Sequence, residues 1–409
     1  MPANGILPIL KRHPELEELH SRLLAFLDAE LPTPLCEEDS RPDWSALRRA
    51  AAGAGLTGID LSAWEGSEAG GRVAQGMAMF LAGERDCDAR EVFSSGHAAM
   101  ALHYGTPELV QQTREQVVVR GELAGVASSE PQSGSDLRGF RTVLVDHGDH
   151  YTLSGSKGLI SRVEEAYGFV VFAKIITPEQ VGTIDLRQVP LSALWVPMNT
   201  KGVLTETTEP LGMRGWSFGH LHFVDAQLPK ELLLGAPGDG RRIFDTHFSA
   251  WRLMMSLVCL GAAAAAIRES ADRTRRRTVG RLPLAAIPSV AARLGTAAAE
   301  VEAATAWCFA LLERIDQGDI DAAACSAAKA LATDVAYRAV DLALQLHGSE
   351  GYTRRTPMEK RLRDIRGLRI ADGPNDTLYS VLAHAMLTEG EAPQGQAPQS
   401  EDLRLLASR

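Results

Sequence analysis

The hydrophobic pattern of this chain changes period twice, and this order constrains the fold more than any other feature. From residue 1 to about residue 124, apolar residues recur at the spacing of amphipathic helices, as at Leu16, Leu23 and Leu27. From about Gly125 they alternate with polar residues or form short runs bounded by turns, which is typical of strands. From Arg242 the helical spacing returns.

We therefore predict an α+β protein with three domains. An N-terminal helical domain is expected over residues 1–124, a small middle β-sheet or barrel domain over residues 125–241, and a C-terminal antiparallel four-helix bundle over residues 242–389. Three domains suit a chain of 409 residues, which exceeds one ordinary core. Residues 390–409 are rich in Gly, Pro, Gln and Glu, and we expect them to be disordered.

Individual elements can be placed within these domains. In the middle domain a hairpin is expected over residues 143–153, with short strands at residues 169–173, 194–196 and 220–224. In the bundle, helices are expected at residues 252–276, from Pro283 or Pro288 to about 316, at 319–348 and at 375–387. The N-terminal domain is expected to provide packing and one wall of a pocket, without chemistry of its own. The junction of these layers would be concave, which is a usual place for a cofactor.

Charge and cysteine usage exclude several function classes. The net charge of −10 and the pI near 5.6 argue against a nucleic-acid partner, because phosphate binding needs a basic face. The five cysteines are dispersed, which predicts reduced thiols and a cytoplasmic protein. Neither CxxC nor HExxH spacing occurs, so no metal site is expected. No stretch of eighteen uncharged apolar residues occurs, so no membrane span is expected.

A polar loop at residues 128–136 follows the first apolar run of the middle domain. Pro131 biases the preceding residue away from helix, and Gly134 permits unusual backbone angles. The loop is rich in hydroxyls and backbone N–H donors, so it could bind the rim of a planar ligand such as a flavin. The alternative interpretation of the same residues is a surface turn.

Five segments in order resemble motifs of the acyl-CoA dehydrogenase family of flavoproteins. Residues 129–136 resemble T-E-P-x-x-G-S-D, and residues 153–161 resemble L-N-G-x-K-x-W-I-S. Residues 211–217 resemble an L-G-x-R segment, residues 345–352 resemble Q-x-x-G-G-x-G-Y, and residues 363–373 resemble R-D…I-x-E-G. The resemblance covers nearly the whole chain expected to fold, from about residue 55 to residue 387.

This resemblance implies an FAD enzyme that oxidises the Cα–Cβ bond of an acyl thioester. The family's general base, usually Glu, falls on Asp372, which would remove the α proton while flavin N5 takes the β hydride. The other base position used in the family falls on Trp251, which cannot serve. Arg252 matches an arginine that orients the base. From the residues alone, Asp372 before Gly373 could equally be a helix N-cap.

The resemblance also implies sites for cofactor, substrate and partner subunit. Substrate would contact Ser135, Asp136 and Gly373. Gln345 and Gly348 match positions that hold the adenosine end of the partner's FAD, which implies a homodimer or homotetramer. The full set of residues expected to bind FAD is Ser128, Ser129, Ser135, Leu159, Ser161, Arg276, Gln345, Gly348, Pro374 and Asp376.

Departures from the family pattern favour a specialised acyl substrate, carried on CoA or on an acyl carrier protein. Leu159 replaces the Trp of W-I-S, Pro374 replaces a Thr, and Lys360 and Ser349 replace an Arg and a Gly. The expected electron acceptor is an electron-transferring flavoprotein. Two alternatives stay open: a flavoprotein oxidase or monooxygenase resembling nitroalkane oxidases, and a relative that has lost catalysis.

Overall fold

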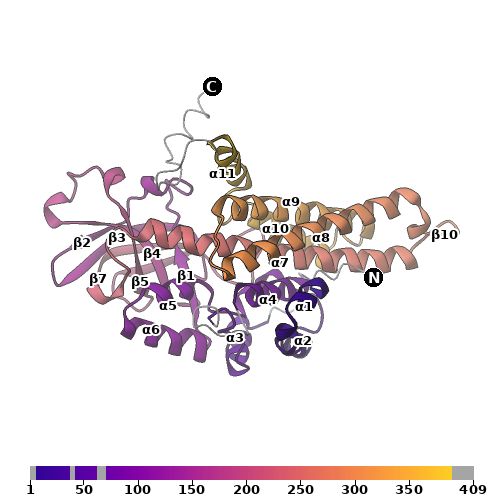
Figure 1. Cartoon of the computed structure of the whole chain (residues 1–409), viewed down its shortest axis with the longest axis horizontal. Helices are drawn as coiled ribbons and strands as arrows, with labels where there is room; N and C mark the ends of the chain where they lie inside the picture. Colours follow the sequence, from indigo (N-terminus) through magenta and orange to yellow (C-terminus); the bar gives the residue numbers. More distant parts are fainter. Residues whose placement is uncertain (1–5, 37–41, 62–70, 389–409) are drawn as a thin grey trace.

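The computed structural model describes residues 6–36, 42–61 and 71–388, so the tail predicted at residues 390–409 lies outside the described residues. An eight-stranded mixed sheet occupies one end of the molecule, and long helices extend from it at the other end (Figure 1). The predicted α+β class is confirmed.

The N-terminal part is helical, as predicted, with Leu23 and Leu27 buried on the stripe expected from their spacing. A 3-10 turn at Cys87–Glu91 lies between the fourth and fifth helices, and a π-helical turn at Arg114–Val119 follows the sixth. The helices are α1 (Leu7–Arg12), α2 (Glu17–Glu30), α3 (Trp44–Gly53), α4 (Arg72–Arg85), α5 (Ala99–Tyr104) and α6 (Pro107–Thr113).

The sheet has the strand order β6-β7-β3-β2-β4-β5-β8, with β1 also paired to β4. β6 and β8 remain at its edges among the described strands, so of the two predicted forms, sheet or barrel, it is the open sheet that is observed. The predicted hairpin is confirmed, because β2 and β3 pair antiparallel with Asp146 opposite Tyr151. The strands are β1 (Leu123–Ala127), β2 (Val143–Asp146), β3 (His150–Ser161), β4 (Ala166–Ile176), β5 (Leu191–Pro197), β6 (Val203–Thr207), β7 (Phe218–Pro229) and β8 (Leu233–Leu234).

Strand β4 explains the continuous apolar run seen in the sequence. Phe169 and Val171 contribute to one buried cluster, whereas Val170 and Phe172 contribute to a second. Successive side chains of a strand point to opposite faces, so both faces of β4 must be covered, and a strand covered on both faces shows no polar alternation.

The position of the polar loop follows from a break in the pairing along β4. β1 pairs in parallel with the first half of β4, and β2 pairs in parallel with the second half. Since β5 occupies the other edge of β4, β1 and β2 must share one edge in succession. The chain between them, residues 128–142, therefore leaves the sheet as a loop at that point.

The C-terminal part contains one helix more than predicted. The helices are α7 (Gly240–Arg276), α8 (Pro288–Asp316), α9 (Ala322–His347), α10 (Pro357–Leu368) and α11 (Asn375–Thr388), with a short hairpin of β9 (Thr278–Val279) and β10 (Leu282–Pro283) after α7. The four predicted helices are present as α7, α8, α9 and α11, and α10 is an additional short helix that the sequence did not predict: it is charged, and its stripe includes the buried Arg361 beside Met358 and Ile365. Of the two predicted starts for α8, Pro288 is the observed one.

Helix α7 lies at the centre of the bundle and also packs against α4 of the N-terminal part (Figure 1). It is long and apolar enough to cross a membrane, but 94% of its most apolar 18-residue window is buried within the protein. The two helices approach so closely that a Cβ on Gly261 would lie 2.0 Å from the Phe80 carbonyl oxygen. One hydrophobic core therefore joins the N-terminal helices to the bundle.

Candidate active site

A large cavity of about 3260 Å³ opens where the sheet meets the bundle. Its walls come from the polar loop, the end of β3, the first half of α7 and the segment between α10 and α11. The concave junction expected from the order of the layers is therefore present. Ser128, Ser129, Ser135, Asp136, Leu159, Ser161, Arg252, Asp372, Gly373 and Pro374, all predicted as site residues, line it together.

A buried ion pair beneath the polar loop holds it in place. The Lys157 ammonium donates to Glu130 Oε1 at 2.8 Å and to the Ser128 carbonyl at 2.9 Å. The Glu130 carboxylate also accepts the backbone N–H groups of Arg141 and Thr142 at 2.6 and 3.0 Å. These bonds tie the loop to β3 and to the entry of β2, so the backbone carrying the serines is fixed.

The electrostatics of this pair keep both groups charged near neutral pH. Burial lowers the pKa of Lys157 to about 8, against the pull of Glu130. Burial would raise the pKa of Glu130, but Lys157 and the backbone donors lower it below its ordinary value. Lys157 was not predicted as a site residue, because its position between Ser156 and Gly158 on β3 gives no sign that its ammonium is buried.

Asp372 lies in the segment between α10 and α11 that borders the cavity. Its φ of 55° is left-handed, and Gly373 follows with φ 106°, so the backbone turns sharply here. Asp372 is half-buried, and within the described part of the chain its carboxylate accepts no hydrogen bond. The N-cap alternative is therefore not realised, and the carboxylate is left available to a ligand.

Two cations hold the backbone around Asp372 without pairing directly with its carboxylate. Arg252 Nε donates to the Asp372 carbonyl oxygen at 2.9 Å. Lys329, fully buried on α9, donates to the Gly373 carbonyl at 2.7 Å and to Asn375 Oδ1 at 3.1 Å. Lys329 and Asn375 were not predicted as site residues, although a lysine on the apolar stripe of a buried helix was an available signal.

Burial raises the pKa of Asp372 above its ordinary value, and four cations oppose this effect. Lys329 and Arg252 contribute most of the opposing field, followed by Arg90 and Arg162. Burial in turn lowers the pKa of Lys329 to about 8. A carboxylate with a raised pKa is a stronger base than an ordinary aspartate.

Comparison with known proteins agrees with this geometry. The family model described as acyl-CoA dehydrogenase, middle domain, matches residues 125–226, and the model described as acyl-CoA dehydrogenase, C-terminal domain, matches residues 238–387. The mitochondrial short-chain specific acyl-CoA dehydrogenase of Bos taurus is 31% identical over 289 residues, which is 70% of this chain and 68% of the bovine protein. The chain belongs to the acyl-CoA dehydrogenase family.

Two further relatives extend the match along the chain. The mitochondrial short-chain specific acyl-CoA dehydrogenase of Homo sapiens is 29% identical over 388 residues, covering 91% of each protein. The structure of butyryl-CoA dehydrogenase from Megasphaera elsdenii superimposes with a TM-score of 0.81 at 22% identity, covering 91% of this chain and 98% of the other. At that identity, the superposition shows that the fold is shared.

Acyl-CoA dehydrogenases are FAD-dependent oxidoreductases, and the cavity residues fit such a cofactor. The cavity exceeds the roughly 300–1,000 Å³ of ordinary small-molecule pockets, so it has room for a dinucleotide and a thioester arm. The hydroxyls of Ser129 and Ser161 are half-buried and bond to no other described residue. Leu159 is 62% exposed at the rim, where an apolar ring could cover it.

Four of the residues predicted to bind the cofactor do not line the cavity. Arg276 is exposed at the last turn of α7, and Gln345 and Gly348 are exposed at the end of α9. Asp376 is exposed on the first turn of α11. The α9 end is held by a different arginine, because Arg273 donates to the His347 carbonyl at 2.9 Å.

The N-terminal region forms one wall of the cavity, as expected, and this wall contains charged side chains that were not predicted as site residues. Arg90, Glu91 and His97 line the cavity beside Arg162 from the end of β3. Each of the four is at most 4% exposed. They lie in two 3-10 turns and in the loop after β3, where no hydrophobic period marks which side chains face inward.

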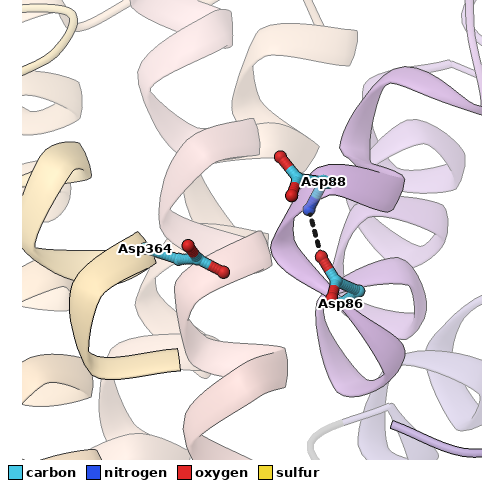
Figure 2. Close-up of side chains that lie close together, drawn as sticks. All are labelled: Asp86, Asp88 and Asp364. Carbon is cyan, nitrogen blue, oxygen red and sulfur yellow. Dashed lines mark hydrogen bonds between the residues drawn. The ribbon is translucent and has the colours of Figure 1, made fainter. Parts of the chain in front are cut away.

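A cluster of three carboxylates lies near this wall, formed by Asp86 and Asp88 from one turn and Asp364 from α10 (Figure 2). The group has the spacing of a cation site, but the Lys360 ammonium lies within it, 2.7 Å from Asp86 Oδ2 and 2.8 Å from Asp364 Oδ2. Although burial opposes it, the three carboxylates raise the pKa of Lys360 well above its ordinary value. The cluster is an ion network that ties α10 to the Cys87–Glu91 turn.

Proposed function

We propose that this protein is an FAD-dependent dehydrogenase that oxidises the Cα–Cβ bond of an acyl thioester, with Asp372 as the general base. The observation that carries the proposal is the Asp372 carboxylate, which borders the cavity without a hydrogen-bond partner among the described residues. Arg252 and Lys329 fix its backbone, so the carboxylate can meet a ligand without rearrangement.

The reaction follows from the acidity of the substrate and the basicity of Asp372. The thioester carbonyl acidifies the α C–H, and Asp372 accepts that proton as a general base. Bound FAD supplies the two-electron acceptor for the hydride that leaves Cβ. The raised pKa of Asp372 favours proton transfer to its carboxylate, and the cations around it oppose that rise.

The remaining predicted residues have roles consistent with this proposal. Ser128, Ser129, Leu159, Ser161 and Pro374 would hold the flavin ring, and Ser135, Asp136 and Gly373 would border the thioester arm. We further infer a homodimer or homotetramer, in which the exposed Arg276, Gln345 and Gly348 contact the partner's FAD. Asp376, which lies outside the cavity, would contribute only through the surface of α11.

The test is the bleaching of bound FAD in anaerobic solution. Purified protein loaded with FAD should lose its flavin absorbance on addition of acyl thioesters carried on CoA or on an acyl carrier protein, and the faster carrier identifies the physiological one. D372N should slow bleaching at least about a hundredfold, as expected for loss of a general base. D341N, which changes an exposed aspartate on α9, is the matched control. Equal rates for D372N and the wild type would refute the assignment of the base.

The electron acceptor distinguishes this proposal from an oxidase on the same fold. A dehydrogenase should be reoxidised slowly by air and rapidly by an electron-transferring flavoprotein. Rapid reoxidation by O₂ after a single turnover would instead identify an oxidase or monooxygenase. A protein that binds no FAD would be a non-catalytic relative.

A further inference from the structure

A buried asparagine connects the segment that carries Asp372 to helix α9. Asn375 is the first residue of α11 and is 7% exposed, and it does not line the cavity. Its Oδ1 accepts a hydrogen bond from the Lys329 ammonium at 3.1 Å. Its Nδ2 donates to the Ala330 carbonyl at 3.1 Å and to Asp334 Oδ1 at 2.9 Å. The amide therefore lies between a buried cation and a carboxylate of the same helix.

The chemistry of these partners fixes the orientation of the Asn375 amide. An ammonium group can only donate a hydrogen bond, whereas a carbonyl and a carboxylate can only accept one. The observed orientation turns the amide oxygen to Lys329 and the amide nitrogen to Ala330 and Asp334. A flipped amide would face like groups at all three contacts and leave buried polar atoms unpaired, which is costly. Both ends of the amide thus hold it in one orientation.

Lys329 lies in the electric field of two aspartates, Asp372 and Asp334. Burial lowers the pKa of Lys329 to about 8, and Asp372 opposes this effect more than Asp334 does. Within the described part of the chain, Lys329 forms no ion pair with either carboxylate. Its hydrogen bond to the Gly373 carbonyl at 2.7 Å holds the ammonium beside the turn that carries Asp372. The Asn375 amide contacts the same ammonium from the side of Asp334.

Other groups also act on Lys329 and on the two aspartates. Asp334 Oδ1 accepts from Arg369 Nε at 2.6 Å, and its Oδ2 accepts from the Tyr379 hydroxyl at 3.3 Å. Cys259 of α7 acts on Lys329 too, but burial raises the pKa of that thiol to about 12, so it is neutral. The remaining charges that act on Asp372 are the guanidinium groups of Arg252, Arg90 and Arg162. Among the described residues, Asn375 is the only side chain that bonds to both the Lys329 ammonium and the Asp334 carboxylate.

We propose that Asn375 is a positioning residue for the base: its amide separates the Lys329 ammonium from Asp334 and holds it beside the turn of Asp372 and Gly373. The inference rests on the proposed dehydrogenase function and adds a residue to the machinery of that site. Without the amide, the flexible lysine side chain would turn toward the carboxylate of its own helix, because a carboxylate attracts an ammonium more strongly than a carbonyl does. The positive charge would then move away from the base.

The pH dependence of flavin bleaching provides the first readout, because its rising limb follows the ionisation of Asp372. N375A should move this limb to higher pH by at least about half a unit, as expected when a unit charge moves a few Å away from a carboxylate at an effective dielectric of about 20. N199A is the matched control, since it changes an exposed asparagine in the turn after β5, and its limb should stay in place. If N375A lowers the rate equally at every pH, Asn375 only stabilises the fold and the inference is overturned.

A substitution of Asp334 separates the proposed role from a general loss of packing. In D334N the competing charge is absent, so Lys329 gains no ion pair by leaving the turn of Asp372. N375A should therefore shift the limb in the wild-type background but not in the D334N background, and this difference is the coupling that a double-mutant cycle measures. Equal shifts in both backgrounds would refute the proposed separation. Should N375A fail to fold, N375S keeps a polar group that is too short to bridge both partners, and it must show the same dependence on Asp334.

A measurement without substrate distinguishes this inference from the proposed function. The pKa of Asp372 can be followed by the carbon NMR signal of its carboxyl group in aspartate-labelled protein, assigned by the loss of that signal in D372N. The upward shift in N375A and its absence in N375A/D334N are expected there as well. If no thioester bleaches the flavin but this pattern is observed, the proposed function fails and the role of Asn375 in placing Lys329 stands. Bleaching by a thioester without this pattern overturns the present inference alone.

Discussion

Replacing Lys329 by methionine would show whether the buried cation on α9 tunes the base as well as holding its segment. Methionine preserves much of the volume of lysine and removes both hydrogen bonds, to the Gly373 carbonyl and to Asn375 Oδ1. It also removes the largest charge that opposes the raised pKa of Asp372. We expect the pKa of Asp372 in K329M to rise further.

The magnitudes decide which readout is informative. Each lost hydrogen bond to a charged group is worth about 1.5–3 kcal/mol. Burial lowers the pKa of Lys329 from 10.5 to about 8. At about 1.36 kcal/mol per pKa unit, keeping Lys329 charged in the folded protein costs about 3 kcal/mol, and K329M removes this cost. These effects offset each other in the free energy of unfolding, so stability is a poor test. At an effective dielectric of about 20, a unit charge about 4–8 Å from a carboxylate changes the free energy of its ionisation by roughly 2–4 kcal/mol, which is more than one pKa unit.

The assay is the pH dependence of flavin bleaching between about pH 5 and about pH 9. Asp372 must be ionised to accept a proton, so the rate rises with pH through its pKa. In K329M the rising limb should move to higher pH by at least about one unit, and the rate should recover above it. K329R keeps the charge, so its limb should stay near that of the wild type. A rate that falls equally at every pH, with the limb unmoved, would refute the electrostatic role.

Two other substitutions test the packing that positions the site, each measured by urea unfolding of the FAD-loaded protein. K157M should lower the free energy of unfolding by about 3–5 kcal/mol, because it leaves the Glu130 carboxylate buried without the partner 2.8 Å away; a loss under about 1 kcal/mol would contradict this. G261A should cost roughly 1–3 kcal/mol or more, because its Cβ would lie 2.0 Å from the Phe80 carbonyl oxygen. G295A, on an exposed turn of α8 with open space around it, should instead stabilise the protein by roughly 0.5–1 kcal/mol, and destabilisation by both would refute the close-contact explanation.

Several elements were predictable because their signals are local. The stripe on α2 and the apolar run in β4 each depend on residues within a few positions. Helix α10 and strand β6 were not predicted, because their local signals are weak. The apolar stripe of α10 is diluted by charge, and β6 is an exposed edge strand whose Leu204 faces solvent.

The sequence by itself determined the order of the layers and the family, because hydrophobic period and motif spacing are carried by neighbouring residues. Only the tertiary structure decided what surrounds the Asp372 carboxylate. Lys329 comes from α9, Arg90 from an N-terminal turn and Arg162 from the end of β3, and these segments meet because α4 packs on α7 and the sheet abuts the bundle. Contacts between residues so distant in the chain leave no period in the sequence, so the electrostatics of the site appear only in the folded protein.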